Sequence, residues 1–144
     1  MRIEIYTDGS CNQSTKNGGW SFLILEEGDI KIKEAGKEED VTNNQCEMIA
    51  VISACKFLDG REYFENPHIT LYSDSAYVVN AFVNDWISKW LTNGWKNSEG
   101  NNVLNKELWE TIIHYQQKYS INFQYIRRRS NHYAKMVDDL AKAT

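Results

Sequence analysis

Apolar and polar residues alternate along much of the first forty positions, as they do in β-strands with one buried face. Three such segments are separated by stretches rich in turn-forming residues: "RIEIYTD" (2–8), "WSFLILE" (20–26) and "IKIKEAG" (30–36). The second is apolar nearly throughout, so we expect it in the middle of a sheet. Because short turns join strands that are neighbours, these segments predict an antiparallel meander.

A helical period replaces this alternation after residue 42. Apolar residues now recur every three or four positions, at Met48, Ile49, Ile52, Cys55 and Leu58. Thr42 or Asn43 is expected to cap the start of the helix, because both side chains can accept a hydrogen bond from its first turn. Gly60 is expected to end it.

The remaining segments continue the chain as a mixture of strands and helices. Their periods predict strands at 68–74 and 121–126, and helices at 75–85, 86–91, 103–119 and 132–143. Strands that follow a meander and are reached through helices form a mixed sheet covered by helices. We therefore expect an α/β fold with a mixed sheet of five strands covered by helices.

Length, charge and cysteine content narrow the class of protein. The 144 residues predict one domain, 1–144, and no apolar run approaches the ~20 residues of a membrane span. The start of the chain lacks the apolar segment of a signal peptide, so a cytoplasmic protein is expected. A net charge of −4 argues against binding nucleic acid by bulk charge alone. The odd count of three cysteines argues against a disulfide framework.

Acidic residues lie where a sheet of this kind gathers its ligands. Asp8 and Asp74 end the first and fourth strands, Glu47 lies near the start of the first helix, and Asp138 and Asp139 lie in the last. Each alone has an ordinary explanation as a turn, a helix cap or an exposed residue. Together they form a candidate site for Mg2+ or Mn2+, since clustered carboxylates repel unless a cation neutralises them. Two such ions about 4 Å apart would support phosphodiester hydrolysis.

Five segments, in this order, resemble type 1 ribonuclease H. They are "YTDGSCNQSTKNGGWSFLIL", "TNNQCEMIAVISACKFL", "LYSDSAYVVNAF", "DWISKWLTNGWKN" and "VDDLAKA", and together they span nearly the whole chain. The resemblance implies an RNase H-like fold, in which the fourth and fifth strands run parallel to the first. It also implies hydrolysis of the RNA strand of RNA–DNA hybrids. The expected products carry 5'-phosphate and 3'-hydroxyl ends. The chain carries no P-loop, no G-x-S-x-G elbow and no zinc-ligand spacing that would favour another chemistry.

The resemblance also assigns metal ligands by position. Asp8, Glu47, Asp74 and Asp138 match the family's four metal-binding acids, whereas Asp139 does not. Two Mg2+ or Mn2+ ions are expected with substrate bound. Asp8 would bridge them, Glu47 and Asp74 would hold one, and Asp138 would hold the other.

Substrate contacts are expected around the start of the first helix. Asn43, Asn44 and Gln45 suit the recognition of 2'-hydroxyls, which only the RNA strand of a hybrid carries. The resemblance places Thr42 near a phosphate of the DNA strand. The alternative is that these side chains only cap the helix.

A tryptophan-rich segment at about 84–102 resembles the protrusion of many bacterial family members. Trp86, Trp90 and Trp95 lie within ten residues of one another. By resemblance Trp90 contacts the DNA strand, and Lys89 and Lys96 are candidates for phosphate contacts. The alternative for these tryptophans is a small core that anchors the helix.

The closing stretch departs from the family pattern. Arg128 or Arg129 occupies the position where many members present a histidine, and Ala134 replaces a usual asparagine. His132 is a candidate for the displaced proton shuttle, because its ordinary pKa suits that task. The alternative is an exposed residue at a helix start.

Two alternative functions follow. One is a catalytically weak module that binds hybrids with the same fold, and intact carboxylates argue against it. The other is a nuclease domain of a larger assembly, such as a reverse transcriptase. Our expectation is a monomeric enzyme with an RNA–DNA hybrid and no membrane as its partner.

Overall fold

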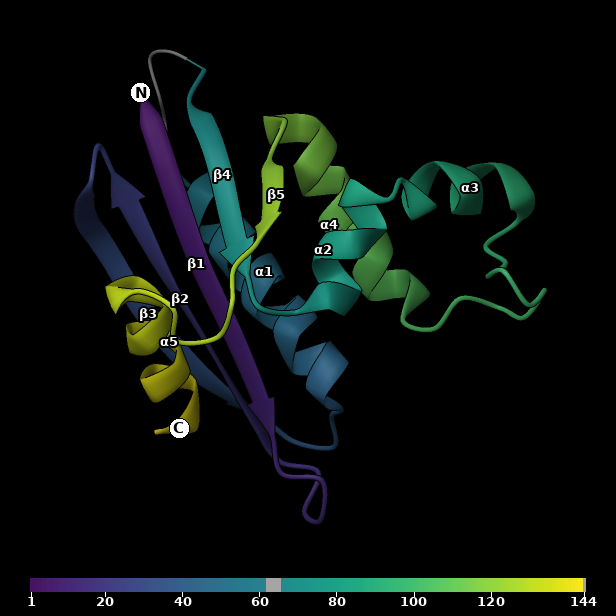
Figure 1. The fold of residues 1–144 in the computed structure, drawn as a ribbon, viewed down its shortest axis with the longest axis horizontal. Helices are drawn as coiled ribbons and strands as arrows, with labels where there is room; N and C mark the ends of the chain where they lie inside the picture. Colours follow the sequence, from purple (N-terminus) through teal and green to yellow (C-terminus); the bar gives the residue numbers. More distant parts are fainter. Residues whose placement is uncertain (62–65, 144) are drawn as a thin grey trace.

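A computed structural model describes residues 1–61 and 66–143 of the chain. Five strands form one sheet in the order β3-β2-β1-β4-β5, where β1 is Arg2–Cys11, β2 Gly18–Glu26, β3 Asp29–Glu38, β4 His68–Ser73 and β5 Asn122–Tyr125. β1, β2 and β3 pair antiparallel, whereas β4 runs parallel to β1, and β5 to β4 (Figure 1). The expected meander and mixed sheet are confirmed.

Helices cover both faces of this sheet (Figure 1). Helix α1 (Asn43–Asp59) packs against one face with α4 (Lys106–Tyr119) beside it, and α5 (His132–Lys142) packs across β1 and β2 on the other. Successive side chains of a strand point to opposite faces, so alternation decides which helix each side chain meets. Ile3 and Ile5 of β1 point into the core with α1, while Tyr6 packs with Val137 of α5. β1 is therefore buried on both faces.

The start of α1 is fixed by a reciprocal cap. The Thr42 hydroxyl accepts a hydrogen bond from the Gln45 backbone N–H at 3.1 Å, and the Gln45 side chain accepts one from the Thr42 N–H at 3.0 Å. Thr42 is thus the cap, and not Asn43. Gly60 follows the last turn with φ −82°, so the helix ends there without a left-handed residue.

Helix α2 (Ala76–Val83) packs on β5, whereas α3 (Trp86–Asn93) and the loop that returns to α4 extend away from the sheet (Figure 1). The prediction that the helix now labelled α4 starts at residue 103 was wrong, because it begins at Lys106. The Val103 N–H donates to the Trp95 carbonyl at 2.9 Å, and Asn105 has φ 61°, so both residues belong to the loop. Within the described part of the chain, no helix is long and apolar enough to cross a membrane.

Candidate active site

Parallel pairing of β1 and β4 brings two acids to the same edge of the sheet. The register places Tyr6 opposite Tyr72, so Asp8 and Asp74 both follow the paired segment two residues later. Asp8 is 5% exposed and Asp74 is half-buried. Two carboxylates therefore lie just past the parallel pairing of β1 with β4, on the side of the sheet that the sequence predicted. The prediction that Asp8 ends the first strand was wrong, because β1 stays paired with β2 as far as Cys11.

Gly9 brings a third acid to these two. A Cβ at this position would lie 2.5 Å from the backbone of both Cys46 and Glu47, so only glycine lets α1 approach β1 this closely. The Gly9 N–H donates to Glu47 Oε1 at 2.8 Å and to Asp8 Oδ1 at 2.9 Å. Ser73 Oγ donates to Glu47 Oε2 at 3.4 Å. These contacts fix the buried Glu47 carboxyl beside Asp8.

The electrostatics of the three acids favour protonation in the absence of a cation. Asp8, Glu47 and Asp74 each offer an oxygen, and these oxygens lie within 4.8 Å of one another. Burial, followed by the nearby charge of Asp74, raises the pKa of Asp8 to about 7. Burial and then the Asp8 charge raise the pKa of Glu47 well above its ordinary range. Burial also raises the pKa of Asp74, although Arg128 opposes the effect.

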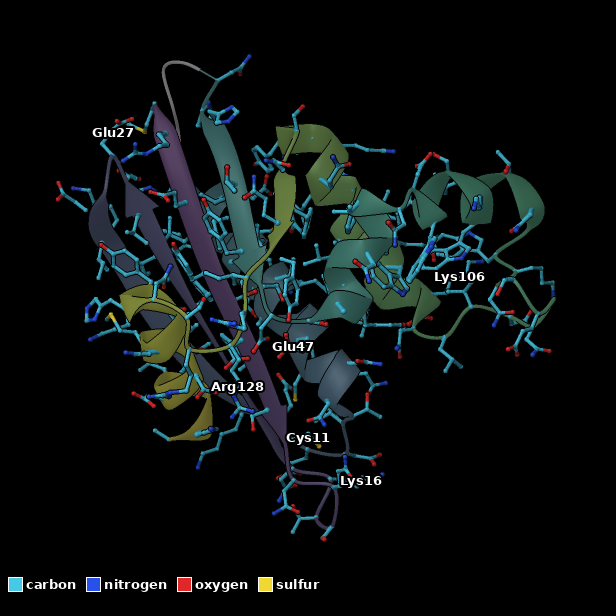
Figure 2. The ribbon with its side chains drawn as sticks, viewed as in Figure 1. Cys11, Lys16, Glu27, Glu47, Lys106 and Arg128 are labelled. Atoms are coloured by element: carbon cyan, nitrogen blue, oxygen red, sulfur yellow. The ribbon has the colours of Figure 1, made fainter. Side chains whose placement is uncertain are left out.

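Asp138 reaches the same place from α5 but has a different environment. Its side chain is buried, with Arg129 Nη1 at 2.7 Å, Lys142 Nζ at 3.2 Å and Arg128 Nη2 at 3.3 Å. Burial alone would raise the pKa of Asp138, but the hydrogen bonds from Arg129 and Lys142 leave it below the ordinary value. Figure 2 shows Glu47 on the α1 side of the centre and Arg128 on the α5 side.

One open pocket of about 490 Å³ collects all four acids. Its walls come from β1, α1, the β4–α2 connection, the loop before α5, and α5 itself, and its polar lining includes Asp8, Asn43, Asn44, Glu47, Asp74, Arg128 and Asp138. Carboxylate oxygens are the ligands that Mg2+ and Mn2+ prefer. The three acids other than Asp138 fit a divalent ion, because such an ion would relieve the repulsion that raises their pKa values.

Some side chains at the start of α1 are held by hydrogen bonds within the protein, and others are exposed at the pocket. Gln45 is occupied by the cap and by an Nε2 hydrogen bond to Asn105 at 3.2 Å. Asn43 Oδ1 accepts from the Cys11 N–H at 2.9 Å, which holds the end of β1 against α1. Asn44 is exposed and lines both the carboxylate pocket and a second one. Asn44 and the amide nitrogen of Asn43, which also lines the carboxylate pocket, therefore remain available to a ligand.

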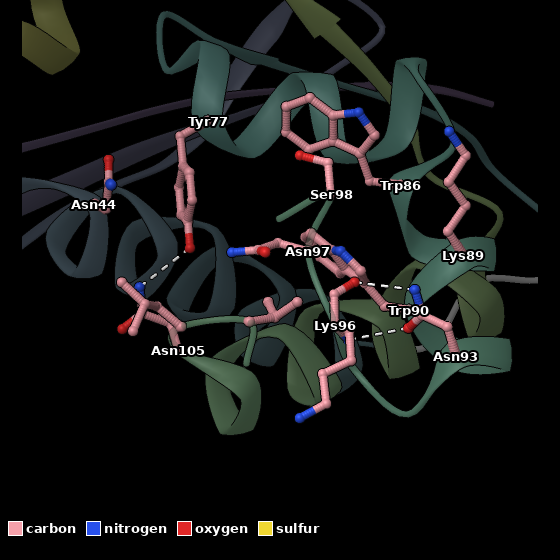
Figure 3. Close-up of a pocket in the computed structure, with 12 residues that line it drawn as sticks. Asn44, Tyr77, Trp86, Lys89, Trp90, Asn93, Lys96, Asn97, Ser98 and Asn105 are labelled. Carbon is pink, nitrogen blue, oxygen red and sulfur yellow. Dashed lines mark hydrogen bonds between the residues drawn. The ribbon is translucent and has the colours of Figure 1, made fainter. Parts of the chain in front are cut away.

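This second pocket has a volume of about 440 Å³ and shares Asn44 and Tyr77 with the first. Figure 3 shows the residues that line it. Trp86 and Trp90 line it, with Lys89 and Lys96 at its margin. Trp90 is 8% exposed because it packs between Trp95 and Trp109, with ring centroids 5.8 and 5.3 Å away. Trp90 is thus a core residue whose exposed edge forms part of the pocket wall.

The loop before α5 brings arginines, and not His132, to the acids of the pocket. Arg128 lines the carboxylate pocket, and Arg129 reaches Asp138. His132 is exposed at the first residue of α5, beside Tyr133, and is not among the residues that line the pocket. The structure therefore brings both candidate arginines to the acids, but leaves His132 outside the pocket lining.

Three contributors to the site were not predicted as part of it: Gly9, Ser73 and Lys142. Gly9 had only a turn signal, since "DG" is common in turns. Ser73 precedes Asp74 and carries no signal of its own. Lys142 lies four residues after Asp138, so helical spacing could have identified the contact.

Comparison with known proteins agrees with this geometry. The family profile described as RNase H matches residues 1–144. The ribonuclease H of Acetivibrio thermocellus is 38% identical over 141 residues, covering 97% of this chain and 92% of that protein. The ribonuclease H of Caldicellulosiruptor saccharolyticus is 35% identical over 142 residues, covering 98% and 94%.

Solved structures share the fold. The crystal structure of LC11-RNase H1 in complex with RNA/DNA hybrid superposes with a TM-score of 0.76 at 21% identity, covering 99% of this chain and 95% of that one. LC9-RNase H1 gives a TM-score of 0.80 at 22% identity, covering 99% and 71%. With a full-length family match, relatives above 30% identity and the expected RNase H-like fold all in agreement, this chain belongs to the RNase H family.

Proposed function

We propose that this ribonuclease H hydrolyses the RNA strand of RNA–DNA hybrids at the carboxylate pocket, leaving 5'-phosphate and 3'-hydroxyl ends. The observation that carries the proposal is the convergence of Asp8, Glu47, Asp74 and Asp138 on one open pocket. Asp8, Glu47 and Asp74 are gathered at a cost in electrostatic repulsion, which is of little use to a protein that only binds an anionic strand. They suit a centre that holds divalent cations.

Two ions, Mg2+ or Mn2+, complete this proposal. When bound, they supply Lewis-acid activation of water and stabilise charge on the leaving oxygen. Asp8, which interacts with each of the other acids, would help to hold both ions, Glu47 and Asp74 would contribute to one, and Asp138 to the other. The Gly9 N–H and Ser73 hydroxyl orient Glu47, so its carboxylate is positioned before a ligand arrives.

A path for the substrate connects the two pockets. Asn44 lines both, so a strand that crosses the carboxylate pocket can continue to the surface formed by Trp86 and Trp90. Asn43 and Asn44 are candidates for contacts to 2'-hydroxyls, and Gln45 supports them through the cap. LC11-RNase H1, which shares this fold, was crystallised in complex with an RNA/DNA hybrid, and this supports a hybrid as substrate for this chain.

Phosphate contacts are proposed on both sides of this path. Thr42 lies at the start of α1, where backbone N–H groups favour an anion. Lys89 and Lys96 lie at the margin of the second pocket, and Arg128 and Arg129 lie beside the acids. A monomer in the cytoplasm is part of the proposal, to be checked by size-exclusion chromatography and cell fractionation.

The test compares three labelled substrates: an RNA–DNA hybrid, duplex RNA and duplex DNA, each with Mg2+, with Mn2+ and with EDTA. We expect cleavage of the RNA strand of the hybrid alone, abolished by EDTA and by Asp8→Asn. The matched control is Asp29→Asn, which removes an exposed acid at the start of β3 and should cleave like wild type. Binding of the hybrid without cleavage under all conditions would favour the alternative of a binding module.

A further inference from the structure

The four acids of the pocket are not equivalent, because one of them already has cations. Asp138 Oδ2 accepts from Arg129 Nη1 at 2.7 Å and from Lys142 Nζ at 3.2 Å. Asp138 Oδ1 faces Arg128 Nη2 at 3.3 Å. Both oxygens therefore contact cations of the chain itself. Asp138 also interacts with Asp8, but it is not one of the three acids, Asp8, Glu47 and Asp74, whose oxygens lie within 4.8 Å of one another.

The loop that carries Arg129 is fixed at both ends. The Ile126 N–H donates to the Ser73 carbonyl at 2.9 Å, and the Asn131 side chain caps α5 by accepting from the Ala134 N–H at 2.8 Å. Between them, the Ser130 N–H donates to the Arg127 carbonyl at 3.1 Å and closes a turn. Arg129 has φ 54° in this turn, in the left-handed region that a non-glycine residue adopts only at a cost in free energy. The backbone therefore aims Arg129 at α5.

A second carboxylate of α5 also holds the Arg129 guanidinium in place. Arg129 Nη1 also contacts Asp139 Oδ1 at 2.7 Å, so one nitrogen lies between two adjacent acids of α5. Asp139 is exposed and takes no part in the pocket, which gives the otherwise unassigned second aspartate of "VDDLAKA" a role. It anchors the arginine that covers Asp138.

We propose that Arg129 is a positioning residue that closes Asp138 to divalent ions until an anionic ligand draws the guanidinium away. This inference rests on the function proposed above, because it concerns the same site. In the substrate-free protein, Arg129 takes the place of an ion at Asp138. A backbone phosphate of the substrate competes for the guanidinium, since both partners favour bidentate hydrogen bonds. Asp138 then loses its nearest cation, and a metal ion can replace it while Lys142 and Arg128 stay at their longer distances.

The exposure of the ion pair makes such an exchange feasible. The Arg129 side chain is 41% exposed, so solvent weakens its attraction to Asp138 and leaves its outer nitrogens accessible. Arg128 is 58% exposed and contacts the same carboxylate at a longer distance. The buried carboxylate stays in place while its exposed partner moves, so the pocket gains a ligand without any change in α5.

The experiment measures Mn2+ binding to the substrate-free protein by isothermal titration calorimetry, without any activity readout. Arg129→Gln should bind the ion at the Asp138 site roughly fivefold more tightly than wild type, because the nearest competing cation is gone while Lys142 remains. Arg127→Gln is the matched control, since it removes an exposed arginine of the same turn that makes none of these contacts. It should bind Mn2+ like wild type.

A double variant tests whether the gain in Mn2+ affinity arises at Asp138. Adding Asp138→Asn to Arg129→Gln should abolish the gain, and circular dichroism should show that each variant is folded. Equal affinity in wild type and Arg129→Gln would overturn the inference, as would a gain that survives Asp138→Asn or appears equally in Arg127→Gln. If Asp8→Asn abolishes Mn2+ binding in the same titrations, the metal site stands even where the inference fails. If no folded variant binds Mn2+, both fail.

Discussion

Replacing Asp8 with asparagine should stabilise the metal-free protein, although Asp8 is a proposed metal ligand. In the absence of metal, Asp8 is a buried carboxylate facing Glu47 and Asp74, and burial with the Asp74 charge raises its pKa to about 7. Asp8→Asn keeps the size of the side chain and an oxygen that can accept from the Gly9 N–H, but removes the charge. The metal-free variant should therefore unfold at higher denaturant concentration than metal-free wild type.

The size of this stabilisation and its dependence on pH follow from the raised pKa of Asp8. A pKa of about 7 against an ordinary 3.8 disfavours the charged form in the folded state by roughly 4 kcal/mol, since each pH unit corresponds to about 1.4 kcal/mol. We expect about 2 kcal/mol of this to be measured, because the neighbouring acids adjust their own protonation. Between about pH 4 and pH 7 the folded protein keeps a proton that the unfolded chain has released. Wild-type stability should thus fall as pH rises through this range and level off above it.

The assay is urea unfolding followed by tryptophan fluorescence at pH 4.5, 6 and 8, in EDTA and in Mn2+. The gain from Asp8→Asn should be largest at pH 8 and small at pH 4.5. Adding Mn2+ should stabilise wild type but not the variant, because the ion binds only a folded site with its ligands intact. A variant that is less stable than metal-free wild type at pH 8 would refute the electrostatic account of the site.

Other predictions concern the residues around the acids. Gly9→Ala should destabilise the protein by about 2 kcal/mol in urea unfolding and weaken Mn2+ binding in calorimetry, because its Cβ would overlap the α1 backbone at Glu47; a change under about 0.5 kcal/mol would contradict the close packing. Replacing Lys89 and Lys96 together with glutamine should raise KM for the hybrid more than it lowers kcat in steady-state assays, and an unchanged KM at moderate salt would count against phosphate contacts there. His132→Ala should lower kcat by well under tenfold, since the side chain is exposed outside the pocket lining; a larger loss would restore it to the mechanism.

Periodicity predicted most of the elements because each strand and helix of this chain buries a face that its own sequence marks. The alternation of Ile3, Ile5 and Tyr6 separates the two cores of the structure, and the helical spacing after residue 42 produces α1. The prediction failed at the start of α4, where apolar Val103 fits the helical pattern. There a hydrogen bond to the Trp95 carbonyl holds Val103 in the loop, and no local pattern records such a contact.

The sequence by itself determined the identity of the acids, the order of the elements around them and the replacement of the usual histidine by arginine. Tertiary structure decided which of these groups meet. The convergence of Glu47 on Asp8 depends on a glycine that lets two backbones touch, and the pairing of Arg129 with Asp138 depends on a turn between β5 and α5. Charge states were decided there too, because a pKa depends on burial and on neighbours that are distant in sequence. Hence one chain presents three acids that repel one another and a fourth that its own cations already neutralise.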